Sequence, residues 1–110
     1  MKLPDMKFKK IDWCNIKATV VPGEVGIAHS YTDEENTLRT RVMVYEPGFV
    51  LDHYCDRGHV LYVIEGEIVV DLADGREFSF PAGTGFAVSD FGDKAHRMRS
   101  DNGARVFIVD

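Results

Sequence analysis

The sequence has no apolar stretch that approaches the roughly 20 residues of a membrane-spanning helix. Its N-terminus, MKLPDMK, lacks the apolar segment of a secretory signal. Basic residues are too few for a nucleic-acid surface, because 13 Lys and Arg against 18 Asp and Glu give a net charge of -5. We therefore expect a cytoplasmic protein with no membrane and no nucleic-acid partner.

Cysteine is scarce, and helical periodicity is missing. The chain has only Cys14 and Cys55, and in a reducing compartment we do not expect them to form a disulfide. Glycine and proline recur at short intervals, and the apolar residues alternate with polar ones instead of repeating every three or four positions. With 110 residues, the chain is long enough for one core and one domain.

Alternation predicts a series of short strands. The segment Leu38–Tyr45 is the clearest, with Arg39, Arg41, Met43 and Tyr45 on one face and four less polar residues on the other. A polar loop is expected at 32–36 and a hairpin at Asp74-Gly75. Further strands are predicted at 25–31, 50–55, 59–65, 67–72, 76–80, 85–88, 96–99 and 105–109. This spacing is typical of an all-β barrel or sandwich, residues 21–110, preceded by an extended arm, residues 1–20.

Three of the four histidines fall in a pattern with Cys55. His53 and Cys55 are two positions apart, so on a strand their side chains share a face. His59 follows four residues after Cys55, and His96 would be brought in by the fold. Imidazole and thiolate are the usual ligands of zinc, and imidazole also suits iron, nickel and copper. The alternative is structural, because single histidines and a lone cysteine in strands are often ordinary core or surface residues.

The same residues carry a resemblance to the cupin family. Pro47-Gly48, His53-Tyr54-Cys55, His59 and Gly66 resemble the first cupin motif, with Cys55 at the position of its second histidine and His59 at that of its glutamate. Gly83, Gly92 and His96 resemble the looser second motif. The string DHYC at 52–55, followed by Gly58-His59, is similar to a small cupin subgroup named for a DHCW-type motif, which has no settled activity.

The resemblance implies a cupin fold, a double-stranded β-helix or jelly-roll barrel, around one divalent transition metal. The implied ligands are His53, Cys55, His59 and His96. Replacing the glutamate by His59 favours zinc, with iron, nickel or copper as alternatives. If Cys55 also binds, four protein ligands close the site, and such sites tend to be structural. If it does not, one position stays open for water or substrate.

The resemblance also implies an inward-facing pocket near the metal. Its expected lining residues are Tyr62, Phe86, Met98 and Phe107, and core packing is the alternative for each. Arg39 and Arg41 are candidates for binding a carboxylate substrate, against a solvated or interface role. Asp52, Asp56 and Arg57 flank the ligands and are candidates for orienting them.

Two functions remain open from the sequence. One is a metal-dependent enzyme acting on a small polar molecule, such as a dioxygenase, isomerase or lyase. The other is a non-catalytic, metal-stabilised binding or sensor module, because no second catalytic pair is visible. In both cases the partner is a small-molecule ligand, and by analogy with cupins we expect a homodimer, with the N-terminal arm crossing to the neighbouring subunit.

Overall fold

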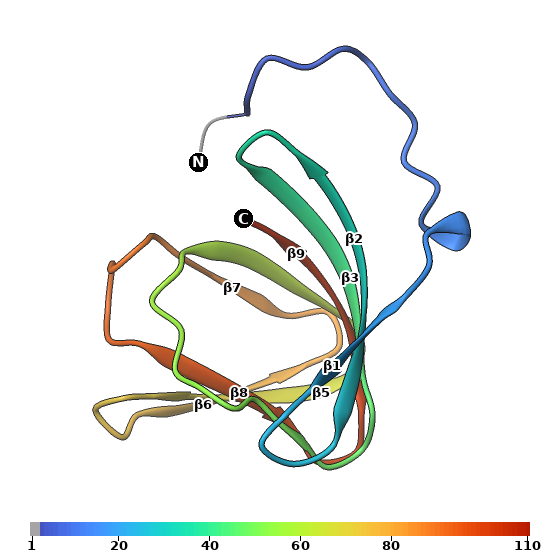
Figure 1. The fold of residues 1–110 in the computed structure, drawn as a ribbon. Coiled ribbons are helices and arrows are strands. Elements are labelled where there is room, and N and C mark those ends of the chain that lie inside the picture. Colours follow the sequence, from blue (N-terminus) through green and yellow to red (C-terminus); the bar gives the residue numbers. More distant parts are fainter. Residues whose placement is uncertain (1–2) are drawn as a thin grey trace.

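The computed structural model describes residues 3–110 and is built almost entirely of β-strands (Figure 1). A short 3₁₀ turn, η1 (Trp13–Asn15), precedes the first strand. The strands that follow are β1 (Thr19–Pro22), β2 (Ile27–Glu35), β3 (Leu38–Tyr45), β4 (Phe49–Val50), β5 (His59–Leu72), β6 (Glu77–Pro81), β7 (Gly85–Val88), β8 (His96–Ser100) and β9 (Ala104–Val109). The all-β prediction is confirmed.

The strands form one strongly curled antiparallel sheet in the order β1-β2-β3-β9-β5-β8-β4. The long strand β5 serves both halves of it, since its first part pairs with β7 and its second part with β6. A register shift between Val63 and Glu65, followed by Gly66 at a φ of 77°, bends β5 between these parts. The bend curls the sheet into the half-barrel seen in Figure 1.

The core lies on the concave face, and alternation selects most of it. Met43 and Tyr45 of β3, Leu61 and Val63 of β5, and Val106 and Ile108 of β9 are all buried, whereas their neighbours along each strand are more exposed. Phe49, Ile68, Val63 and Val106 are among the most completely enclosed side chains. Each side chain of this kind contributes about 2 kcal/mol by leaving water.

Two predicted segments differ from the structure. The polar run at 32–36 was expected to be a loop, but β2 continues to Glu35 and pairs with β3 up to the Glu35–Leu38 pair. A tight turn at Asn36, which has a φ of 53°, closes this hairpin, so polar composition did not interrupt the ladder. The predicted strand at 50–55 is also wrong, because β4 ends at Val50 and only an isolated bridge at Cys55 follows.

The N-terminal arm contacts the sheet at two points. The indole of Trp13 packs edge-on against Phe107 of β9, with ring centroids 5.7 Å apart. Nearer the N-terminus, Lys9 forms ion pairs with Asp33 and Glu35 of β2 at 2.9 and 3.0 Å. Of the arm predicted over residues 1–20, the first two residues lie outside the described part, and strand β1 already begins at Thr19.

Candidate functional site

Polar side chains replace the core at one end of the concave face. On β3 the inward positions before Met43 are Arg41 and Arg39, because alternate residues share a face. The pairing of Val60 with Val109 brings His59 beside Asp110, just beyond the end of β9. The group also includes His96 at the start of β8 and Arg57 from the loop before β5. We call Arg39, Arg41, Arg57, His59, His96 and Asp110 the polar end layer.

Two histidines of this layer meet through their ring nitrogens. The Nε2 atoms of His59 and His96 lie 3.0 Å apart, and the two rings are nearly perpendicular. Phe86 of β7 packs against both rings, with centroid distances of 5.6 and 5.9 Å. The two imidazoles therefore point at one another inside a largely apolar environment.

Burial keeps this histidine pair neutral. Burial and, to a smaller extent, the charge of a protonated His96 together lower the pKa of His59 to about 4. Burial likewise lowers the pKa of His96. Because both pKa values are lowered, both rings have at neutral pH the uncharged form that a metal ligand requires.

Asp110 is a buried carboxylate surrounded by cations. Its side chain is 1% exposed, and Arg39 binds it with both ends of the guanidinium, Nε to Oδ1 at 2.9 Å and Nη2 to Oδ2 at 2.8 Å. Arg41 reaches Oδ2 at 3.3 Å and Arg57 at 3.5 Å. Burial by itself would raise the pKa of Asp110, but the hydrogen bonds from Arg39 and the charges of the three arginines lower it below its usual value.

The cations in this layer are not fully compensated. Three guanidinium groups face the single carboxylate of Asp110. The Nε atom of Arg41 and the Nδ1 atom of His59 are buried without a hydrogen-bond partner among the described residues, and Nδ1 lies 3.9 Å from Asp110 Oδ2. Burial lowers the pKa of Arg41, and the neighbouring charge of Arg39 lowers it further. The layer thus combines buried positive charge with unused hydrogen-bond donors.

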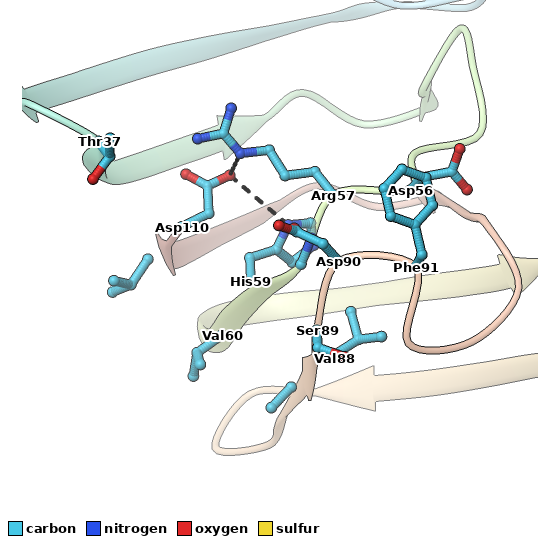
Figure 2. Close-up of a pocket in the computed structure, with 13 residues that line it drawn as sticks. Thr37, Asp56, Arg57, His59, Val60, Val88, Ser89, Asp90, Phe91 and Asp110 are labelled. Carbon is cyan, nitrogen blue, oxygen red and sulfur yellow. Dashed lines mark hydrogen bonds and ion pairs between the residues drawn. The ribbon is translucent and has the colours of Figure 1, made fainter. Parts of the chain in front are cut away.

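An open pocket of about 1060 Å³ reaches this layer from solvent. Figure 2 shows Arg57 extending above His59 toward Asp110, with Asp90 beside His59 and Phe91 to the right. Its lining also includes Thr37, Asp56 and Ser89, and apolar residues from the ends of β5, β7 and β9. The loops 56–58 and 89–92 both line its mouth.

Gly58 lets these two loops lie against each other. Its N–H donates to Asp90 Oδ1 at 2.5 Å. A Cβ atom at this position would lie 2.5 Å from the backbone nitrogen of Asp90, which is closer than real Cβ atoms come. The backbone N–H of Phe91 also donates to the carbonyl of Asp56 at 3.0 Å. These contacts fix the mouth of the pocket.

The structure brings together only part of the predicted metal-ligand set. His59 and His96 converge, and Cys55 is linked to His96 by two backbone hydrogen bonds of 2.7 and 3.0 Å. His53 is different: its side chain is 64% exposed and its Nδ1 binds Asp52 at 2.6 Å. Within residues 3–110, no three His, Cys, Asp or Glu side chains gather closely enough to hold a metal ion. The arrangement as described therefore supplies two converging ligands and does not complete a site.

The position of His53 follows from the early end of β4. The prediction placed His53 and Cys55 on one strand face, but residues 52 and 53 form a bend, so the alternation does not apply. Residues two positions apart share a face only in an extended strand, so the bend lets the side chains of His53 and Cys55 point in different directions. Sequence spacing therefore does not fix where His53 points.

The predicted pocket residues divide between the two faces of the sheet. Phe86 and Met98 lie on the concave face, Met98 within the core and Phe86 against the histidines. Tyr62 and Phe107 form a cross-strand pair on the opposite face, where Tyr62 is 52% exposed. We correct their expected role accordingly, because each alternates with buried neighbours that fill the concave face.

Arg39 and Arg41 do face inward, and two residues of the site were missed by the sequence analysis. Asp110 shares a face with Val106 and Ile108, so extending the alternation of the last strand by one step would have placed it inside. Phe91, at the mouth, has no comparable sequence signal because it lies in a loop.

Comparison with known proteins identifies the fold. No protein-family model and no curated protein matches the sequence. A predicted oxalate decarboxylase from Thermotoga maritima superposes with a TM-score of 0.76 at 16% identity, over 92% of this chain and 96% of that one. The polyketide cyclase RemF from Streptomyces resistomycificus gives 0.72 at 19% identity, over 94% of this chain and 78% of that one.

A third solved structure is a sugar phosphate isomerase of the cupin superfamily from Silicibacter pomeroyi. It superposes with a TM-score of 0.66 at 21% identity, over 92% of this chain and 74% of that one. In residues 3–110 we find no helix long and apolar enough to span a membrane. Together with the curled antiparallel sheet, these likenesses show that the chain has the cupin fold.

Proposed function

We propose that this protein is a small-molecule-binding cupin that holds or acts on a small polar ligand at a metal centre built on His59 and His96. The observation that carries the proposal is the 3.0 Å approach of their Nε2 atoms. Two nitrogens bound to one tetrahedral zinc at about 2.05 Å each lie about 3.3 Å apart. An increase of a few tenths of an ångström, with a rotation of both rings toward a common point and loss of the shared Nε2 proton, would convert this hydrogen-bonded pair into two metal ligands.

The surroundings of the pair support the same assignment. Both rings are neutral at pH 7, as metal binding requires. The Nδ1 of His59 is buried without a partner among the described residues and faces Asp110 at 3.9 Å. A carboxylate behind the distal nitrogen is the usual way in which proteins orient a ligating imidazole.

Cys55 and His53 are the proposed remaining ligands. Cys55 is held next to His96 by its backbone, and its side chain is only partly exposed. His53 would have to leave Asp52 and turn inward, which the irregular backbone around residue 53 allows. Imidazole and thiolate together favour zinc, with iron, nickel or copper as the alternatives. From the string DHYC at 52–55, followed by Gly58-His59, we also propose that the protein belongs to the DHCW-motif cupin subgroup.

Metal titration of matched histidine variants tests the centre. Zinc binding to chelator-treated protein is measured by calorimetry for the wild type, His59→Gln, His96→Gln and His29→Gln. We expect a single site that the first two substitutions weaken by at least about 100-fold, because each removes one of few ligands. His29 is the control, since its Nε2 lies 2.7 Å from Glu46 Oε2 and it does not belong to the polar end layer.

Equal zinc binding by all four proteins would overturn the proposed centre, as would a loss of binding with His29→Gln. Circular dichroism of each variant establishes that the fold is retained. The contributions of Cys55 and His53 follow from Cys55→Ser and His53→Gln in the same assay, where we expect a smaller but measurable weakening.

We further propose that the protein works as a cytoplasmic homodimer. Val60, Tyr62 and Ile64 alternate along the convex face of β5 and are 48%, 52% and 44% exposed, an apolar row that suits a subunit contact. Phe8 of the arm is fully exposed, whereas Trp13 packs on its own sheet. Both cysteines are free, which fits a reducing compartment. Light scattering tests the dimer, and Tyr62→Glu should shift it toward monomer.

A further inference from the structure

The polar end layer carries more positive charge than it neutralises. Arg39 is committed to Asp110 by two short hydrogen bonds. Arg41 and Arg57 make only single, longer contacts with the same carboxylate oxygen, at 3.3 and 3.5 Å. One carboxylate cannot satisfy the roughly 15 N–H donors of three guanidinium groups, so the layer retains donors for a second anion.

Arg57 is the cation best placed to receive that anion. It lies in the loop before β5, its side chain is half exposed, and it lines the pocket (Figure 2). The contact of its Nε with Asp110 Oδ2 at 3.5 Å is too long for a hydrogen bond, and its guanidinium makes no hydrogen bond with any residue between 3 and 110. A half-exposed guanidinium at a pocket wall with unused parallel donors suits the fork geometry of a carboxylate.

The carboxylates at the rim of the pocket do not cancel the preference of the polar end layer for an anionic ligand. Asp56 and Asp90 also line the pocket, but both are exposed, and Asp90 already accepts a hydrogen bond from Gly58. Water screens charges at the rim far more strongly than charges in the buried layer. The buried carboxylate of Asp110 shows in addition that a group of this shape fits among these arginines.

Phe91 adds an apolar surface at the same mouth. Its ring is 78% exposed, which is unusual for a large aromatic side chain, and it lines the pocket. Its backbone has a φ of 53°, in the left-handed region that a phenylalanine rarely adopts. Such strain is retained mainly where the side chain's position serves a function. Hydrogen bonds from Phe91 N to Asp56 O and from Gly92 N to Ser89 O hold it there.

We propose that the pocket binds a small organic carboxylate, with its carboxylate on Arg57 and its apolar body against Phe91, both of which line the pocket. The inference deepens the proposed function, since it names the ligand class of the same pocket, but it does not depend on a metal. Two separate features carry it, the uncompensated guanidinium groups and the strained, exposed aromatic ring. A neutral ligand would leave the guanidinium charge unused, and a compact inorganic anion would leave the Phe91 ring unused.

Benzoate and its neutral analogue benzamide test the charge requirement. Binding to chelator-treated protein is measured by calorimetry or by ¹⁵N chemical-shift titration. We expect benzoate to bind at least about tenfold more tightly than benzamide, because only benzoate forms charge-assisted hydrogen bonds with Arg57. Arg57→Gln should remove that difference. Arg105→Gln, on the exposed side of β9, is the matched control and should not change it.

Acetate and phosphate test the role of Phe91. Phe91→Ala should weaken benzoate binding by about threefold to tenfold, the range of one aromatic contact, and should leave acetate unchanged. Benzamide binding as tightly as benzoate, or equal effects of Arg57→Gln and Arg105→Gln, would overturn the proposal. So would phosphate binding more tightly than benzoate.

The two proposals fail independently. Loss of zinc binding in His59→Gln with benzoate binding retained would support the metal centre without bearing on the ligand class. Loss of benzoate binding in Arg57→Gln with zinc binding retained supports the ligand class alone. Because Arg57 is not a proposed metal ligand, its substitution separates the two readouts.

Discussion

Arg39 and Asp110 are joined by a two-point ion pair, Nε to Oδ1 at 2.9 Å and Nη2 to Oδ2 at 2.8 Å, at the open end of the concave face. Their backbones are paired as well, since each N–H donates to the other residue's carbonyl at 2.7 and 2.9 Å. This double connection continues the β3–β9 ladder into the site. It fixes the carboxylate around which Arg41, Arg57 and His59 are arranged.

Removing this carboxylate should destabilise the fold and improve anion binding. We expect Asp110→Asn to lower the free energy of unfolding by about 2 kcal/mol, because it leaves a partly buried guanidinium without its partner. Added acetate should restore part of the loss in the variant but not stabilise the wild type to the same extent, because the vacated donors accept it.

Urea unfolding with and without acetate measures both effects. Asp101→Asn is the control, because Asp101 is 75% exposed and lies 3.8 Å from Arg99, a contact that contributes little. An Asp110→Asn protein as stable as the wild type, and indifferent to acetate, would contradict this description of the polar end layer.

Phe91 should lower the stability of the folded protein. Its left-handed backbone is unfavourable for phenylalanine and tolerated by asparagine and glycine. We therefore expect Phe91→Asn and Phe91→Gly to be at least as stable as the wild type, by up to about 1 kcal/mol. Both should bind benzoate more weakly. Thermal unfolding measures the first effect, and a loss of more than about 1 kcal/mol in both variants would show that the ring is a packing residue instead.

Tyr45 should make the protein sensitive to alkaline pH. Its side chain is buried beside Phe49, and burial raises the pKa of Tyr45 to about 12. The unfolded state therefore ionises first, near pH 10. Stability is fully present below pH 10 and falls as the pH rises toward 12, by about 2 kcal/mol.

Comparison of the wild type with Tyr45→Phe isolates this contribution. Urea unfolding at pH 8, 10 and 11.5 should give a steeper loss for the wild type than for the variant, which lacks the ionisable hydroxyl. Parallel losses in the two proteins would mean that other groups cause the alkaline sensitivity.

Alternation along the chain predicted much of the fold. The strand Leu38–Tyr45 has its predicted bounds, and Gly85–Val88 does too, because each is regular and ends at a turn. It could not give the extent of β2, whose polar end residues pair with β3 and bind Lys9. In that strand, long-range pairing outweighed local composition.

The site was less accessible to sequence reasoning, for a physical reason. Alternation correctly separated Arg39 and Arg41 from the other face of β3, but which face is concave depends on the curl of the whole sheet. The convergence of His59 and His96 depends on the same curl, because β8 pairs His96 with Leu72, at the opposite end of β5 from His59. For His53 the sequence pattern was misleading, since a two-residue spacing does not place two side chains on one face where the backbone bends.

The most direct test of the central claim is an NMR measurement of the imidazole nitrogens during zinc addition. In ¹⁵N-labelled, chelator-treated protein, the Nε2 signals of His59 and His96 should shift together and saturate at one zinc per chain, while those of His29 stay unchanged. Retention of the His59–His96 hydrogen bond at saturating zinc, with both Nε2 signals unmoved, would contradict a metal centre at this pair.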